Sequence, residues 1–160
     1  MNRAGWKECF REQYNKPSSF DKITKDCSNT KSMMACKRKR ENRIALLAWA
    51  STKDVFQSSS TSGHVARGTK WYFNVTTDEW GDTAGLWGFT GESDMISVAV
   101  DQYHRCDVYG RNNPSSLQLC WTLGLGHDNG VWIDSGFRCG SALKTSFDDE
   151  NWERIIYHKN

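Results

Sequence analysis

The stretch Ser32-Met33-Met34-Ala35-Cys36-Lys37 marks the point where the periodicity of the chain changes. Before it, apolar residues recur every three to four positions, as they do in helices. After it, short apolar and aromatic runs alternate with Gly, Asn, Asp and Ser, a pattern typical of strands joined by turns. The predicted strands lie at Met33–Lys37, Arg43–Ala50, Trp71–Val75, Met95–Asp101, Leu117–Leu123, Val131–Asp134, Phe137–Cys139 and Trp152–His158. Strands therefore dominate the chain from Ser32 onward.

Two short helices are predicted ahead of these strands. The first is predicted from four apolar residues at helical spacing: Trp6, Cys9, Phe10 and Tyr14. Pro17 ends it, and Ser18 with Asp21 three residues later resembles a capping box that starts the second helix. The fold class we expect is α+β and dominated by strands: an antiparallel sheet or sandwich, to which disulfides attach one or two short N-terminal helices.

The length of the chain indicates one domain, and its charge indicates no electrostatic preference for nucleic acid. The 160 residues fit a single domain, 1–160, with one core, and eight tryptophans make that core aromatic. The 21 basic and 19 acidic residues leave a net charge of +2, which favours neither nucleic acid nor a membrane surface as a partner. No run of about 18 apolar residues exists, so membrane insertion is not expected. The basic run Lys37-Arg38-Lys39-Arg40 is interpreted as a solvated turn between two strands.

Six cysteines indicate a disulfide-bonded protein that is secreted and extracellular. They are Cys9, Cys27, Cys36, Cys106, Cys120 and Cys139. None shows the C-x-x-C spacing of a zinc ribbon or a redox site. The sequence Asn74-Val75-Thr76 adds a predicted glycosylation site at Asn74, and both features belong to the secretory route. Three cysteines precede residue 40 and three follow residue 105, so if all are oxidised, at least one bridge joins the two halves or leaves the chain for a second copy.

The segment 124–136 is the first candidate binding site. Its thirteen residues include four glycines, several short polar side chains and one tryptophan. A sugar offers an apolar C–H face to an aromatic ring and hydroxyls to short polar groups, so this mixture suits a carbohydrate. The alternative interpretation is a set of turn formers around a core tryptophan. The candidate ligand residues are His127, Asp128, Asn129, Trp132 and Asp134.

The segment 78–87 is the second candidate binding site, because it places two tryptophans beside acidic residues. Its candidate residues are Trp80, Asp82 and Trp87. Here too the alternative is that the tryptophans belong to the core.

Patterns that would indicate catalysis are sparse. The four histidines are scattered singly, and no G-x-S-x-G elbow exists. Glu92 and Asp94 follow a glycine-containing stretch and could flank a sugar, which leaves a small secreted glycan hydrolase open as an alternative. A protein-binding inhibitor or adhesive module is a third interpretation. No calcium-loop pattern appears, so no metal or other cofactor is expected. The alternative is that Asp128, Asn129 and Asp134 together hold a calcium ion.

Nine blocks of sequence, spread over nearly the whole chain, resemble those of a known family. They are Gly5-Trp6 with Cys9 and Tyr14, Met34-Ala35-Cys36-Lys37, Leu46-Leu47-Ala48, His64-x-Ala66-x-Gly68, Trp71-Tyr72-Phe73-Asn74, Trp87-Gly88-Phe89, Leu119-Cys120-Trp121, Gly136-Phe137-Arg138-Cys139-Gly140 and Trp152-Glu153-Arg154-Ile155-Ile156-Tyr157. Their order resembles that of a family of small secreted domains from bacteria and marine invertebrates, whose animal members, as in sea worms and feather stars, are lectins. The chain departs from that pattern at Lys37, where arginine is usual, and at Thr122, where histidine is frequent.

The resemblance implies a secreted, non-enzymatic lectin that binds cell-surface or free glycans, with a role in innate immunity. N-acetylglucosamine or N-acetyllactosamine-type glycans are the ligands that the resemblance implies. One shallow sugar site binds weakly, and avidity requires several sites on one particle. We therefore expect a homo-oligomer.

Overall fold

The computed structural model describes residues 5–14, 16, 18–57, 63–77, 83–92, 118–122, 137–140, 144–145 and 150–160. These residues form two antiparallel sheets and two short helices, linked by disulfides, which confirms the predicted fold class. The first sheet has the order β1-β10-β2-β3. Its strands are β1 (Lys7–Gln13), β10 (Trp152–Lys159), β2 (Lys31–Arg38) and β3 (Leu46–Ser51).

The second sheet has the order β4-β5-β6-β7-β8-β9, so it is a meander in which each strand pairs with the next along the chain. Its strands are β4 (His64–Ala66), β5 (Thr69–Thr77), β6 (Thr83–Gly91), β7 (Gln118–Thr122), β8 (Phe137–Gly140) and β9 (Lys144–Thr145). The two-residue turn Arg67-Gly68 joins β4 to β5, with φ of 57° and 67°. Positive φ at both positions is the geometry that suits the twist of a tight hairpin.

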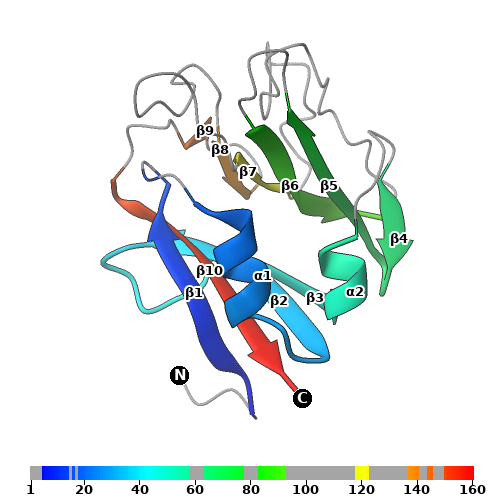
Figure 1. Cartoon of the computed structure of the whole chain (residues 1–160). Coiled ribbons are helices and arrows are strands. Elements are labelled where there is room, and N and C mark those ends of the chain that lie inside the picture. The colour runs from blue at the N-terminus through cyan, green and yellow to red at the C-terminus, as the bar shows by residue number, and fades with distance from the viewer. Residues whose placement is uncertain are drawn as a thin grey trace.

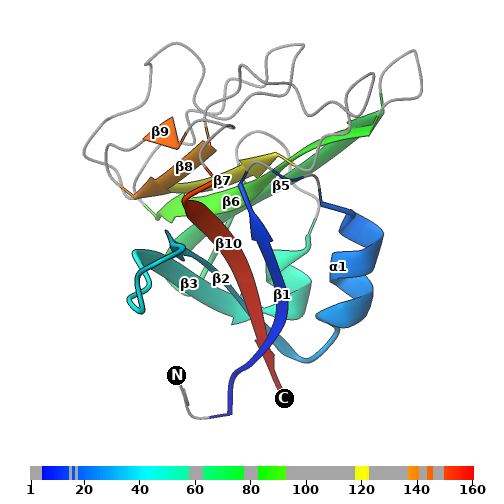
Figure 2. The ribbon, with the colours of Figure 1, turned by 90° about the vertical axis from the view of Figure 1, so that its left-hand side faces the viewer.

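The core lies between the two sheets, whose strands run across one another, and the helices α1 (Phe20–Asp26) and α2 (Thr52–Val55) cover its side (Figures 1 and 2). The first sheet contributes Met34 and Ile156, and the helices contribute Ile23 and Val55. The second sheet contributes mainly aromatic residues: Trp71, Phe73, Trp87, Phe89 and Leu119. The expectation of an aromatic core is therefore met.

The predicted first helix is wrong, because Lys7–Gln13 is strand β1, paired with β10. A register shift between Glu8 and Phe10 marks a bulge there. A bulge adds one residue to a strand and interrupts its alternation. Cys9 and Phe10 consequently both pack against the core, although they are adjacent in sequence. This broken alternation mimics helical spacing.

The second predicted helix is confirmed as α1, but its N-cap is Ser19 rather than Ser18. The Ser19 hydroxyl accepts a hydrogen bond from the Lys22 amide at 3.3 Å. Such a bond satisfies one of the amides that the first turn leaves without a partner. Ile23 is the residue that α1 buries in the core.

Most predicted strands are confirmed, with shifted ends. Arg43–Ala50 begins only at Leu46, and the segments Met95–Asp101 and Val131–Asp134 lie outside the described residues. Strand β6 was not predicted, because its three glycines resemble a loop. Gly88 is required there: a Cβ would lie 2.0 Å from the Leu119 carbonyl oxygen.

Candidate functional site

The two predicted sugar-binding segments connect strands that end at the same end of the second sheet. Strands β5 and β7 run in the same direction, because both pair antiparallel with β6. The segment 78–82 follows Thr77 at the end of β5, and the segment 123–136 follows Thr122 at the end of β7. The structure thus brings the attachment points of both segments together, although they are far apart in sequence (Figure 1).

The register of the strands fixes how these attachment points are spaced. Leu86 pairs with Asn74 on one side and with Thr122 on the other, so the β5–β6 pair extends three residues beyond the level of Thr122. Neighbouring strands lie about 4.8 Å apart, which separates the β5–β6 pair from the β7–β8 pair by about 10 Å.

Most of the predicted ligand residues lie in the segments outside the described part of the chain. These are Trp80, Asp82, His127, Asp128, Asn129, Trp132 and Asp134. Asn74, the predicted glycosylation site, lies on β5, and its backbone pairs with Leu86.

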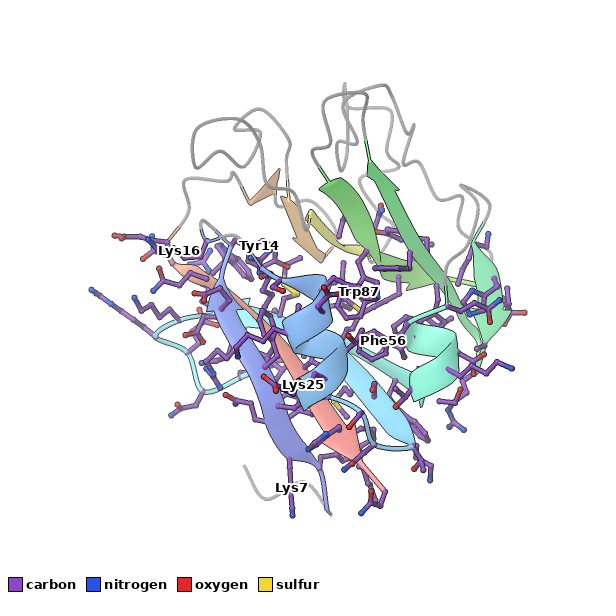
Figure 3. The ribbon with its side chains drawn as sticks, viewed as in Figure 1. Lys7, Tyr14, Lys16, Lys25, Phe56 and Trp87 are labelled. Atoms are coloured by element: carbon purple, nitrogen blue, oxygen red, sulfur yellow. A yellow bond between two sulfur atoms is a disulfide. The ribbon has the colours of Figure 1, made fainter. Side chains whose placement is uncertain are left out.

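Trp87 is a core residue and offers no face to a sugar, so the prediction of a ligand platform at this position is corrected. Its side chain is fully buried on β6, and its indole N–H donates a hydrogen bond to the Val55 carbonyl at 2.8 Å. The rings of Phe56 and Phe73 lie 4.9 and 5.7 Å from it, centroid to centroid (Figure 3). Trp87 therefore packs α2 against the second sheet. Residues 83–87 of the second candidate segment belong to strand β6 and not to a loop.

Glu92, one of the two residues of the hydrolase alternative, lies at the opposite end of the second sheet. It follows the last residue of β6 and is exposed. Its carboxylate lies beside the β4–β5 turn, 3.6 Å from where a Cβ on Gly68 would be. A glycosidase acid lies in an apolar pocket, whereas the Glu92 side chain is exposed. Asp94 lies outside the described residues.

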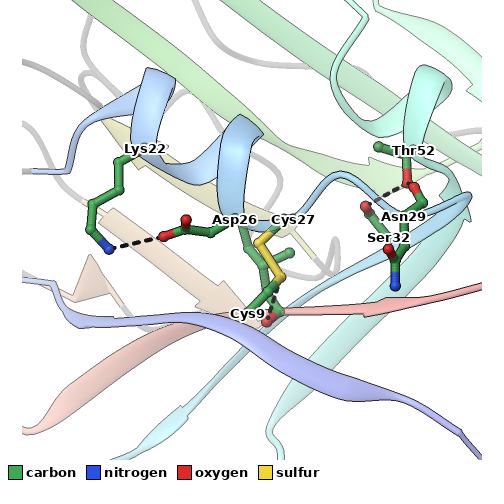
Figure 4. Close-up of a disulfide and its surroundings, with 8 residues drawn as sticks. Cys9, Lys22, Asp26, Cys27, Asn29, Ser32 and Thr52 are labelled. Carbon is green, nitrogen blue, oxygen red and sulfur yellow. Dashed lines mark hydrogen bonds and ion pairs between the residues drawn. A yellow bond between two sulfur atoms is a disulfide. The ribbon is translucent and has the colours of Figure 1, made fainter.

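Two disulfides join elements of the described part of the chain. Cys9–Cys27 attaches α1 to β1 (Figure 4). Cys36–Cys139 joins β2 of the first sheet to β8 of the second across 103 positions of sequence, with Cα atoms 6.0 Å apart. Of the two alternatives that the sequence left open, a bridge between the halves of the chain is therefore observed. Cys120 is also disulfide-bonded, and Cys106 lies outside the described residues.

The charged side chains of the first sheet are divided between its two faces. On the outer face, the Glu153 carboxylate pairs with Arg11 at 2.6 Å and with Lys37 at 3.3 Å. On the core face, Arg154 is fully buried, and its guanidinium donates a hydrogen bond to the Lys16 carbonyl. Burial lowers the pKa of Arg154 to about 10, because the charged form loses its hydration. Arg154 is therefore a structural cation beneath the Lys16 backbone.

The basic hairpin, residues 37–43 at the end of β2 and in its connection to β3, is a surface feature that was predicted from the sequence as a solvated turn. Residues 39–45 connect the two strands, as predicted for the basic run. A hollow of about 300 Å³ beside this connection is lined by Arg38, Arg40, Glu41, Asn151 and Trp152. In the sequence, the density of Arg and Lys indicates the hairpin side of this hollow. The other side could not be predicted, because Asn151 and Trp152 come from the far end of the chain.

Comparisons of the chain with protein-family models, curated proteins and solved structures find no match. In the part of the chain that the structure describes, no helix is long and apolar enough to span a membrane. Within the same residues, no group of three or more His, Cys, Asp or Glu side chains is placed to hold a metal ion.

Proposed function

We propose that this protein is a secreted lectin whose sugar site is formed by segments 78–82 and 123–136 together. The observation that carries the proposal is the strand order of the second sheet, which attaches both segments at one end of it. Each segment has the aromatic and short polar residues that a sugar requires. With Trp87 assigned to the core, the candidate aromatic platforms are Trp80 and Trp132.

The positions of the resembling blocks support a shared scaffold. Trp71, Trp87, Phe89 and Leu119 pack in the core, and Cys36 and Cys139 form the bridge between the sheets. The resemblance is thus carried by residues that build a scaffold. A scaffold does not by itself fix a ligand, so the sugar preference rests on the resemblance alone. N-acetylglucosamine or N-acetyllactosamine-type glycans are the ligands we propose.

Multivalency through a homo-oligomer completes the proposal, because agglutination or adhesion needs at least two sites held apart on one particle. The native mass under non-reducing conditions is expected to be a multiple of 18.3 kDa. Light scattering after size-exclusion chromatography measures it. A monomer at all accessible concentrations would contradict this part of the proposal.

The test is a glycan array with the disulfide-intact protein, followed by affinity measurements on two variants. Trp132→Ala is expected to weaken glycan binding by about 5- to 150-fold without changing the melting temperature, by analogy with the loss of one base stacked on an aromatic ring. Trp6→Ala is the matched control, because Trp6 is a partly buried tryptophan whose ring contacts Trp49 on the first sheet. Equal losses in both variants, or no loss in Trp132→Ala, would remove segment 123–136 from the site.

The same experiment separates the alternatives. Release of reducing sugar from a bound glycan, abolished by Glu92→Gln, would establish the hydrolase instead. An array without hits, together with capture of one defined protein, would establish the protein-binding module.

A further inference from the structure

The basic hairpin, defined as residues 37–43, has a backbone that is held in place at several points. The Glu41 amide donates to the Arg38 carbonyl at 3.1 Å, and the Lys39 amide donates to the Asn151 carbonyl at 2.6 Å. At its base, the Ala45 amide donates to the carbonyl of Cys36, whose side chain is bonded to Cys139. A surface held in this way loses little conformational freedom when it binds a ligand.

Lys37 stabilises the hairpin through two contacts. Its ammonium group pairs with Glu153 at 3.3 Å and donates a hydrogen bond to the Glu41 carbonyl at 2.9 Å. Its side chain is only 12% exposed. The charge of Lys37 is therefore balanced inside the protein and is not available to a partner.

The other four cations of the hairpin are exposed: Arg38, Lys39, Arg40 and Arg43. The hairpin projects from the side of the molecule (Figures 1 and 2). Its one carboxylate, Glu41, approaches Arg38 at 3.9 Å, and both side chains are more than half exposed, at 53% and 55%. An exposed pair at that distance contributes little. The hairpin thus presents a concentrated positive charge on a protein whose net charge is only +2.

The hollow beside the hairpin provides a concave surface next to these positive charges. The Arg38 guanidinium lies 5.4 Å from the centroid of the Trp152 ring, within the range of a cation–π contact, which holds it at the rim. Arg40 adds a second guanidinium group to the lining, which also includes Glu41 and Asn151. Guanidinium groups bind sulfate-like and carboxylate oxygens through paired hydrogen bonds.

We propose that the basic hairpin binds an anionic polysaccharide, with a sulfate or carboxylate group in the hollow between Arg38 and Arg40. Lys39 and Arg43 contact neighbouring charges of the same polymer. This site uses none of the residues proposed for the neutral-sugar site, and it does not depend on the proposed lectin function.

The hollow favours an acidic polysaccharide over nucleic acid, because its described lining offers no platform for a base. Among the described residues that line it, Trp152 is the only aromatic one, and it is 6% exposed beneath Arg38. Single-stranded nucleic acid requires aromatic faces on which its bases stack. An acidic polysaccharide requires only the charges and donors.

The test is binding of the disulfide-intact protein to immobilised heparin over a range of salt concentrations. Arg40→Gln with Arg43→Gln removes two exposed charges and leaves Arg38 on Trp152. We expect heparin affinity to fall about 10-fold at about 0.15 M salt, and the slope of log affinity against log salt to fall by about 2. The matched control is Lys7→Gln with Lys25→Gln, which removes the same charge from β1 and α1 (Figure 3) and is expected to change affinity less than about 2-fold.

A second variant, which removes a negative charge, is expected to change heparin affinity in the opposite direction. Glu150 is exposed and directly precedes Asn151, whose backbone carbonyl accepts the hydrogen bond from the Lys39 amide. Glu150→Gln is expected to increase heparin affinity by about 2-fold or more, since it removes a repulsive charge. Trp132→Ala, which tests the neutral-sugar site, is expected to leave heparin binding unchanged.

Desulfated heparin identifies the recognised group: loss of binding assigns sulfate, and retained binding assigns carboxylate. The proposal is overturned if the unmodified protein fails to bind heparin at about 0.15 M salt. Equal losses in the two double variants would also overturn it. So would tighter binding to single-stranded DNA than to heparin, because that result assigns the hairpin to nucleic acid.

Discussion

Replacing Gly88 by alanine places a methyl group where the second sheet has no room for one. Its Cβ would lie 2.0 Å from the Leu119 carbonyl oxygen and 2.6 Å from the Tyr72 hydroxyl. The first of these contacts is with the backbone of β7, so β6 and β7 must separate to relieve it. The second contact disturbs a buried network, because the Tyr72 hydroxyl donates to the same carbonyl at 2.7 Å and accepts from the Gln118 amide at 3.1 Å.

The expected cost combines two effects. Overpacking of a well-packed interior costs about 1–3 kcal/mol, and a buried polar group that loses its partner costs about 1–3 kcal/mol. A central value of about 4 kcal/mol lowers the melting temperature of a chain of this size by about 8–16 °C. Thermal unfolding under oxidising conditions measures it. Gly68→Ala is the control, since its Cβ would meet nothing closer than 3.6 Å and its positive φ costs only about 1–2 kcal/mol.

A double-mutant cycle with Tyr72→Phe separates the two effects. Tyr72→Phe alone removes the hydrogen bond to the Leu119 carbonyl. In the Gly88→Ala background the same change is expected to cost at least about 1 kcal/mol less, because that bond is already disturbed. A Gly88→Ala melting temperature within about 2 °C of the unmodified protein, or strictly additive effects in the cycle, would refute this reasoning.

Three further outcomes are expected. Trp87→Ala creates a cavity in the core and costs about 3–5 kcal/mol, or about 6–20 °C in melting temperature; a variant that melts normally would contradict the core assignment. Reduction is expected to unfold the protein, because each disulfide contributes about 2–5 kcal/mol to a total of about 5–15 kcal/mol; free thiols at Cys36 and Cys139 in the native protein, detected by mass spectrometry, would contradict it. The Arg11 guanidinium lowers the pKa of Glu8 below 4.5, so this pair stabilises the fold above that pH and the contribution is lost as pH falls through the folded-state pKa. Glu8→Gln should therefore melt with a shallower dependence on pH in the acidic range, and an unchanged dependence would count against the pair.

The sequence predicted the strand-rich fold because most of its strands have a local signature. Trp71–Val75 and Trp152–His158 are apolar and aromatic runs bounded by turn residues, and both are strands. Ser19 caps α1 one position from the predicted Ser18, because either hydroxyl fits the sequence pattern and only the backbone chooses between them.

The wrong predictions concern residues whose structure depends on contacts with segments distant in sequence. The bulge in β1 depends on pairing with β10, which follows about 140 positions later, and no local pattern can reveal it. Gly88 belongs in a strand only because the Tyr72 hydroxyl and the Leu119 carbonyl occupy the space of its side chain. Trp87 is assigned to the core by contacts with α2 and β5 that its sequence neighbours do not show.

The disulfide Cys36–Cys139 links the supports of both proposed sites. Cys36 lies two residues before Arg38 on β2, and Cys139 lies three residues after the segment 123–136 on β8. The backbone carbonyl of Cys36 also accepts the hydrogen bond from Ala45 that closes the base of the hairpin. The same covalent bond therefore fixes the end of the strand that leads into the basic hairpin and the strand that follows the proposed sugar-binding segment. Because a site binds well only when its supporting elements are rigid, the bridge gives the two sheets a common anchor on which both proposals depend.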